Sequence, residues 1–196
     1  MSQGKHIVIV HGYGSAPGRN WFPWLKAELE RRGFSADVLQ LPDAAAPCLD
    51  VWLDCIASHV RDAGCGTFFV AHSLGCISLL GALHRLEAGS RFGGMVLVSG
   101  FSRPVEGLRE LDAFANQEID FARLAAMSGR TVVIAAGDDP VVPAAATEEL
   151  AAKLHAEFIL CEHGGHFMDS DGFKEWPFLL ARIEEVLASS RCRSGT

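Results

Sequence analysis

The chain has 196 residues, 49% of them hydrophobic and 21% charged, a composition close to that of ordinary globular proteins. Its formal net charge of −7 argues against nucleic acid and anionic membranes as partners, because both attract basic surfaces. No apolar run approaches the ~20 residues that a membrane-spanning helix needs. We expect a single domain over residues 1–196, with an ordered core at about 5–187 and a frayed tail at 188–196.

Apolar, strand-like runs alternate along the chain with segments of helix length. In chain order we expect a strand at 6–10, a helix at 21–33, a strand at 35–41, a helix at 48–64, a strand at 67–71, a helix at 74–89, strands at 94–100 and 131–137, a helix at 144–156, a strand at 157–162 and a helix at 172–190. The strands are continuously apolar, which is typical of strands buried on both faces. The alternation predicts an α/β fold of three layers, in which helices cover both faces of a parallel sheet.

Residues 101–128 interrupt this alternation. They form a more polar segment with weak helical signals, inserted between two expected strands. Long excursions at the carboxyl end of a sheet are often binding loops or lids. We therefore expect this segment to influence the choice of substrate.

The N-terminal residues and the cysteines bear on the cellular compartment in which we expect the protein. Residues 1–15 lack the charged start, the apolar core and the cleavage site of a signal peptide. The six cysteines show no C-x-x-C spacing, so neither a zinc site nor a redox pair is indicated. We interpret them as mostly reduced core thiols of a cytoplasmic protein.

The stretch TFFVAHSLGCISLL at 67–80 places a serine between an expected strand and an expected apolar helix. Its centre resembles the nucleophile elbow G-x-S-x-G, in which small residues two positions before and after the serine relieve crowding of the backbone. Here Ala71 stands where the first glycine is usual, and Gly75 keeps the second small position. By itself, a serine at the start of a helix can equally be a simple N-cap.

Two further polar stretches follow later strands. In AAGDDPVVP, Asp138 and Asp139 come directly after an expected strand, and either could orient a histidine, although Asp and Pro also favour ordinary turns. In EHGGHFMD, two glycines permit a tight loop that carries His166, with His163 as a competing residue. The chain order serine, aspartate, histidine, each just past a strand, is the order of the α/β-hydrolases. The three stretches together therefore predict a catalytic triad.

The loop HGYGSAPG at 11–18 follows the first expected strand. The tetrahedral intermediate of acyl transfer needs two N–H donors for its oxyanion. One is expected from the backbone of Leu74, directly after the serine, and the other from this loop, at Tyr13. A phosphate-binding loop is the alternative, but neither G-x-G-x-x-G nor a Walker lysine is present.

The chain resembles the small single-domain serine hydrolases of the RBBP9/YdeN type, within the α/β-hydrolase superfamily, over about residues 5–187. The resemblance rests on VHGYGS, WFPWLKAELERRGF, VAHSLGCIS, LVSGF, IDFARL, DDPVVP, GGHF and EWP. It implies Ser73 as nucleophile, His166 as base and Asp139 as triad acid. It also implies a six-stranded, mainly parallel sheet without a large cap domain. Ala71, where these proteins mostly have glycine, is the departure.

These observations predict a serine hydrolase that cleaves small carboxylester or thioester substrates through an acyl-enzyme on Ser73, with no metal or other cofactor. Phe101, Phe114, Phe167 and Tyr13 are candidate walls of an apolar acyl pocket, although each can equally belong to the core. His72 we interpret as a packing residue. The alternatives are a catalytically weak or inactive hydrolase-fold protein that acts as a binding or interaction module, and a triad used by a lyase or an acyl transferase.

Overall fold

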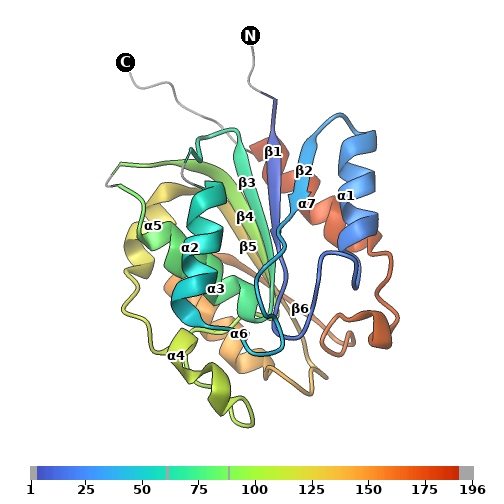
Figure 1. The fold of residues 1–196 in the computed structure, drawn as a ribbon. Coiled ribbons are helices and arrows are strands. Elements are labelled where there is room, and N and C mark those ends of the chain that lie inside the picture. The colour runs from blue at the N-terminus through green and yellow to red at the C-terminus, as the bar shows by residue number, and fades with distance from the viewer. Residues whose placement is uncertain (1–3, 61, 88, 190–196) are drawn as a thin grey trace.

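A computed structural model describes residues 4–60, 62–87 and 89–189 and shows one six-stranded sheet between two layers of helices (Figure 1). The strands are β1 (His6–Val10), β2 (Ser35–Val38), β3 (Thr67–His72), β4 (Phe92–Val98), β5 (Ser128–Ala136) and β6 (Glu157–Cys161). Their order in the sheet is β2-β1-β3-β4-β5-β6, and every neighbouring pair is parallel. The predicted three-layer α/β fold is therefore confirmed.

Two layers of helices enclose the sheet (Figure 1). One apolar cluster joins a face of the sheet to α1 (Phe22–Arg31) and α7 (Pro177–Ser189). A second cluster joins the other face to α2 (Leu49–Val60), α3 (Leu74–His84), α4 (Asp112–Ala115), α5 (Phe121–Met127) and α6 (Ala144–Lys153). Two short 3-10 helices, η1 (Arg109–Leu111) and η2 (Asp169–Asp171), complete the assignment.

The alternation of side chains along each strand divides the core between these layers. In β1, Ile7 and Ile9 pack towards α1 and α7, whereas Val8 and Val10 pack towards the other helices. All four side chains are buried. Successive residues of a strand point to opposite faces, so a strand that is covered on both sides must be apolar at every position. This explains why the sequence shows continuous rather than alternating apolar runs.

The segment 101–128 packs as part of the helical layer. It contains η1, α4 and α5, and its side chains Leu111, Phe114 and Leu124 are buried in the same cluster as α2 and α3. Only short helices form there, so no cap domain is present in the described part of the chain. Residues 101–128 do form an insertion between β4 and β5, as expected, but their apolar side chains pack into the core.

The ends and the cysteines differ in part from expectation. Pro177 begins α7, as its fixed φ and missing N–H favour. The helix runs to Ser189, so residues 188–189 are helical, and the rest of the expected frayed tail lies outside the described residues. Among the described residues, Cys48, Cys55, Cys76 and Cys161 are free, but of these four only Cys76 is buried, and Cys65 is disulfide-bonded. Among the described helices none is long and apolar enough to cross a membrane.

Helix α3 is the central helix of its layer and packs unusually close to the sheet. Its residues from Leu74 to Leu83 are all buried, which only a helix covered on all sides can show. A Cβ atom built on Gly75 would lie 2.5 Å from the carbonyl oxygen of His11 and 2.7 Å from that of Val10. The start of α3 therefore rests directly on the backbone at the end of β1, and no side chain fits between them.

We expect Gly75→Ala to lower the free energy of unfolding by about 1–3 kcal/mol, because the added methyl group must push α3 away from β1. Urea unfolding followed by circular dichroism measures this change. Gly18→Ala is the matched control, since a Cβ at Gly18 meets no atom within 4 Å. Equal stability of the two variants would contradict the close approach of α3 and β1.

Candidate active site

Ser73 lies at the sharp turn between β3 and α3 and has a backbone conformation that is rare for serine. Its φ is 54° and its ψ is −126°, and its side chain makes no hydrogen bond to the start of α3. Its N–H donates instead to the carbonyl of Val98, at 2.8 Å, at the end of the neighbouring strand β4. A relaxed N-cap would have an extended backbone and a capping hydroxyl. The turn is therefore the strained elbow that the sequence indicated.

His166 lies after β6 and reaches Ser73 across the edge of the sheet. Its Nε2 is 2.9 Å from Ser73 Oγ, and both residues are buried. Gly165 has a φ of 53°, which lets the loop turn sharply before His166. The carboxylate of Asp171 accepts the N–H groups of His166 and Met168, each at 3.0 Å, and thereby holds the loop in place.

Asp139 completes a line of hydrogen bonds with Ser73 and His166. The Nδ1 atom of His166 is 2.9 Å from Asp139 Oδ2 and 3.1 Å from Oδ1. Burial by itself raises the pKa of Asp139, but the hydrogen bond from His166 and those from the amides of Val142 and Val141 outweigh it. The net result is a pKa below the usual value of an aspartate, so the buried carboxylate carries its charge.

Asp138 has a different partner set. Its carboxylate accepts the N–H groups of Gly164 at 2.8 Å and Gly165 at 2.9 Å, and it lies 3.3 Å from Nδ1 of His163. The hydrogen bond from Gly165 is the largest of the causes that lower the pKa of Asp138. The two adjacent aspartates thus divide their roles: Asp139 contacts the imidazole of His166, and Asp138 holds the glycine loop that carries it.

His72, which sequence reasoning assigned to packing, also contacts the histidine loop. Its Nε2 donates to the carbonyl oxygen of His166 at 2.8 Å, and the centres of the two rings are 4.8 Å apart. Burial, together with the charge of the nearby His166, lowers the pKa of His72 to about 3. His72 therefore stays neutral and brings no second positive charge to the site. Its position directly before Ser73 was the only signal in the sequence.

His11, a second residue that sequence reasoning missed, supports the loop after β1. Its Nδ1 is 2.9 Å from the carbonyl oxygen of Gly12, to which it donates, and its Nε2 accepts the N–H of Leu41 at 3.2 Å. This pairing requires a neutral ring. Burial keeps the pKa of His11 below the ordinary value for histidine.

The structure brings the loop after β1 next to the start of α3. A Cβ on Gly12 would lie 3.0 Å from both the carbonyl oxygen of His72 and Cβ of Ser73, and 3.4 Å from the amide nitrogen of Leu74. Leu74 is the first residue of α3, and the first N–H groups of a helix have no partner within it. Tyr13, the next residue of the loop, lines the cavity at Ser73. The expected pair of backbone donors, Tyr13 and Leu74, thus belongs to two adjoining segments.

A cavity of about 220 Å³ opens beside Ser73. It is lined by Gly12, Tyr13, Gly14, Ser15, Arg19, Asn20, His72, Ser73, His166, Met168 and Asp169. The lining is largely polar, and no residue of the segment 101–128 belongs to it. The Nη1 atom of Arg19 lies 4.0 Å from Asp169 Oδ2, and Asn20 Oδ1 accepts the N–H of Asp169 at 3.0 Å. Apart from His72 and Ser73 at the end of β3, the residues that line this cavity come from the loops after β1 and β6.

The phenylalanines that we expected to form an apolar wall are absent from this lining. Phe101, Phe114 and Phe167 are each 1% exposed and belong to the core. Phe114 packs edge-on against Trp52, and Phe167 stacks on Trp176 with ring centres 4.4 Å apart. Aromatic side chains gain most when fully buried, and these three are taken up by contacts within the helical layers.

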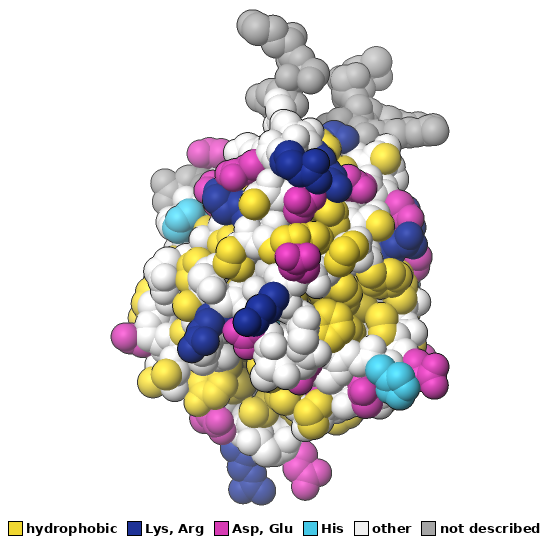
Figure 2. Space-filling model, turned by 90° about the vertical axis from the view of Figure 1, so that its right-hand side faces the viewer, with side chains coloured by type: hydrophobic (Ala, Val, Ile, Leu, Met, Phe, Trp, Pro, Cys, Tyr) yellow, Lys and Arg dark blue, Asp and Glu magenta, His cyan; other side chains and the backbone are white. Residues whose placement is uncertain are grey.

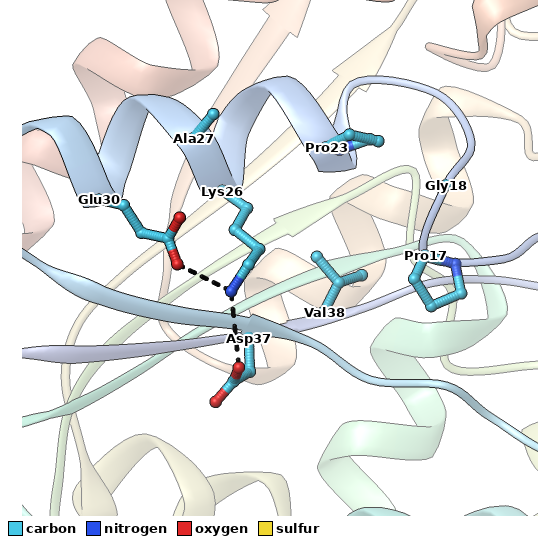
Figure 3. Close-up of a pocket in the computed structure, with 8 residues that line it drawn as sticks. All are labelled: Pro17, Gly18, Pro23, Lys26, Ala27, Glu30, Asp37 and Val38. Atoms are coloured by element: carbon cyan, nitrogen blue, oxygen red, sulfur yellow. Dashed lines mark ion pairs between the residues drawn. The ribbon is translucent and has the colours of Figure 1, made fainter.

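A larger hollow lies elsewhere, between α1 and the edge strand β2 (Figure 3). It has a volume of about 510 Å³ and contains none of the residues around Ser73. Lys26 points across it, 2.9 Å from Glu30 and 3.6 Å from Asp37, and also donates to the carbonyl of Ala36. The charged side chains that line this hollow, Lys26, Glu30 and Asp37, are therefore already paired with one another.

Neither the face shown in Figure 2 nor the metal-binding residue types among the described residues indicate a different kind of site. On the face shown in Figure 2, basic and acidic side chains are interspersed with hydrophobic ones, and no extended basic patch is visible. Within residues 4–60, 62–87 and 89–189, no group of three His, Cys, Asp or Glu side chains is arranged to hold a metal ion.

Comparisons with known proteins agree with this geometry. The sequence profile of the Serine hydrolase family matches residues 7–185. YdeN of Bacillus subtilis, described as a hydrolase, is 36% identical over 94% of this chain and 95% of its own length. Its crystal structure has a TM-score of 0.91 and covers 94% of this chain and 99% of that one. The serine hydrolase RBBP9 of Rattus norvegicus is 22% identical over 84% of this chain and 87% of its own length.

The burial of a neutral His72 predicts a pH-dependent stability. Its pKa is about 3 in the folded protein against 6.5 for a free histidine, so below pH 6.5 the unfolded chain binds a proton that the folded chain does not. Stability from this group is therefore complete above pH 6.5 and falls as the pH drops towards 3. Between pH 7 and pH 5 we expect the wild type to lose roughly 2 kcal/mol more than His72→Gln. Urea unfolding at both pH values measures this, and an equal loss would show that His72 is protonated in the fold.

Proposed function

This chain belongs to the Serine hydrolase family, and we propose that it cleaves small carboxylester or thioester substrates through an acyl-enzyme on Ser73. The observation that carries the proposal is the buried line of hydrogen bonds from Ser73 Oγ through the imidazole of His166 to the carboxylate of Asp139. The descriptions of YdeN as a hydrolase and of RBBP9 as a serine hydrolase support the same reaction class. All three residues follow strands of one sheet, which supports a single functional domain.

In the proposed first step, Ser73 Oγ attacks the carbonyl carbon of the substrate while His166 Nε2 takes the hydroxyl proton. The tetrahedral intermediate collapses by breaking the bond to the leaving oxygen or sulfur, which receives that proton from His166. Water then attacks the acyl-enzyme with His166 again as the base, which releases the acid and restores Ser73. Asp139 holds the imidazole with Nδ1 protonated and stabilises the positive charge that forms on it.

The oxyanion of the intermediate requires donors that are in place before the reaction. We assign this role to the backbone N–H groups of Leu74 and Tyr13, where the loop after β1 meets the start of α3. The positive end of the α3 dipole adds to their effect, since the oxyanion forms at the N-terminus of this helix. The removal of one such donor typically costs about 3–4 kcal/mol of transition-state stabilisation.

The cavity supports a short acyl group. Its volume of about 220 Å³ lies below the roughly 300–1,000 Å³ of most small-molecule sites. Ser15, Arg19 and Asn20 give it polar walls in place of the three expected phenylalanines, and Tyr13 is the one expected aromatic residue that lines it. We therefore propose that short, polar acyl groups are cleaved faster than long alkyl chains.

The strained backbone of Ser73 favours an enzyme over an inactive binding module. A serine at a φ of 54° costs free energy relative to glycine, and such strain persists mainly where function requires it. A binding module has no use for a hydroxyl aimed at His166.

We expect purified protein to hydrolyse p-nitrophenyl acetate faster than p-nitrophenyl octanoate, because the small, largely polar cavity offers a long alkyl chain little apolar surface. Ser73→Ala should lower kcat by at least about 10⁴-fold and should abolish labelling by a fluorophosphonate probe. Ser58→Ala, which removes a hydroxyl that bonds only within α2, is the matched control. Labelling that persists in Ser73→Ala would overturn the assignment of the nucleophile.

The two adjacent aspartates should differ sharply in their effect on catalysis. We expect Asp139→Asn to lower kcat by about 10⁴-fold, because an amide can donate to Nδ1 of His166 and so favours the wrong tautomer. Asp138→Asn should act less strongly, through loosening of the loop at Gly164 and Gly165. Steady-state kinetics on a short ester compares the two. A larger loss of kcat for Asp138→Asn would reverse the assignment of the triad acid.

A further inference from the structure

Ser99 directly follows β4, is completely buried and donates a hydrogen bond from Oγ to Asp139 Oδ2 at 2.8 Å. We propose that Ser99 is a positioning residue, whose hydroxyl fixes the rotation of the Asp139 carboxylate and thereby the orientation of the His166 imidazole. This inference rests on the proposed function, since it concerns the same hydrolysis. Nothing in the triad pattern of the sequence points to this serine.

The two oxygens of Asp139 are held by different parts of the chain. Oδ1 accepts the backbone N–H groups of Val141 at 2.8 Å and Val142 at 3.0 Å, within the turn of Asp139 itself. Oδ2 is the oxygen nearer to His166 Nδ1, at 2.9 Å against 3.1 Å. Among the described residues, Ser99 is the only partner of Oδ2 apart from His166. The two backbone N–H groups hold Oδ1 and Ser99 holds Oδ2, so Ser99 supplies the side-chain contact that fixes the oxygen presented to the imidazole.

The direction of this hydrogen bond is unambiguous. A charged carboxylate can only accept, so the hydroxyl of Ser99 must donate. Hydrogen bonds to charged groups are stronger than those between neutral groups. Ser99 is completely buried, so water does not compete readily for either partner. The contact therefore has a defined geometry, as a positioning contact requires.

The backbone of Ser99 is strained, so a serine at this position suggests that its hydroxyl has a role. Its φ is 47°, in the left-handed region where glycine is favoured and serine is not. Its N–H donates to the carbonyl of Ile134 at 2.9 Å, which joins the end of β4 to the C-terminal part of β5. This conformation points the hydroxyl towards Asp139, which follows β5. Glycine would relieve the backbone strain but would remove the hydroxyl. The hydrogen bond to Asp139 is therefore what a serine offers at this position and a glycine does not.

Two variants separate the hydroxyl from the backbone. Ser99→Ala and Ser99→Gly both remove the hydrogen bond to Asp139, but only Ser99→Gly relieves the positive φ. We expect kcat for a short p-nitrophenyl ester to fall by about tenfold in both variants, with little change in KM. Thermal unfolding should show Ser99→Gly to be the more stable of the two. An equal loss of kcat in two variants of different stability would show that the loss is due to the missing hydroxyl and not to a less stable fold.

Ser102→Ala is the matched control, since Ser102 is also buried after β4 but its hydroxyl has no hydrogen-bond partner among the described residues. It should keep the kcat of the wild type. A kcat of Ser99→Gly within twofold of the wild type would overturn the inference, because the serine would then serve the backbone alone. Wild-type turnover that survives in Ser73→Ala would instead overturn the proposed function.

A measurement that does not depend on turnover tests the same contact. The proton on His166 Nδ1 is hydrogen-bonded to Asp139 and is observable at low field in the proton NMR spectrum. We expect its resonance to shift or broaden in Ser99→Gly and Ser99→Ala and to stay unchanged in Ser102→Ala. An unchanged resonance in both Ser99 variants would overturn the inference whatever the substrate proves to be.

Discussion

The direct contact between the start of α3 and the end of β1 is the constraint on which the site depends. Gly75 and Gly12 have no side chains, and each lies where a Cβ would meet the backbone of the opposite segment at 3.0 Å or less. This contact brings the first N–H groups of α3 beside the loop that carries Tyr13. It also forces the chain to leave β3 through a sharp turn, in which Ser73 takes a positive φ. One close approach of backbone to backbone thus creates both the elbow and the expected oxyanion site.

Charge in the site is controlled by hydrogen bonds and not by exposure to water. Asp139 remains charged although its side chain is only 1% exposed, because backbone amides, the imidazole of His166 and the hydroxyl of Ser99 all donate to it. His72 lies against the same imidazole but stays neutral, since a second positive charge in this dry environment would be unfavourable. The site therefore holds one negative charge opposite the imidazole that must become positive in the proposed mechanism.

Ala71 shows how the elbow accommodates a side chain where the nucleophile-elbow pattern G-x-S-x-G has glycine. It is fully buried and belongs to the same apolar cluster as the side chains of α3. In the sheet it pairs with Val10 on one side and Leu97 on the other. The methyl group is thus absorbed on the α3 face of the sheet, while the close backbone contact is made at Gly75. A small residue is tolerated at position 71, but position 75 has room for glycine alone.

The sequence by itself determined the α/β architecture, because continuous apolar strands that alternate with helices satisfy only a parallel sheet covered on both faces. It also indicated Ser73, the aspartate pair and His166, since chain order and the position of each just after a strand are local properties. The local pattern left Asp138 and Asp139 open and the family resemblance favoured Asp139, whereas only the tertiary structure showed which carboxylate contacts His166. The tertiary structure alone also placed the three phenylalanines in the core and brought Ser99 and His72 into contact with the site. These outcomes depend on side chains that lie 27 to 94 residues apart along the chain. Neither periodicity nor composition encodes such distances, which arise from the packing of α3 and the register between neighbouring strands.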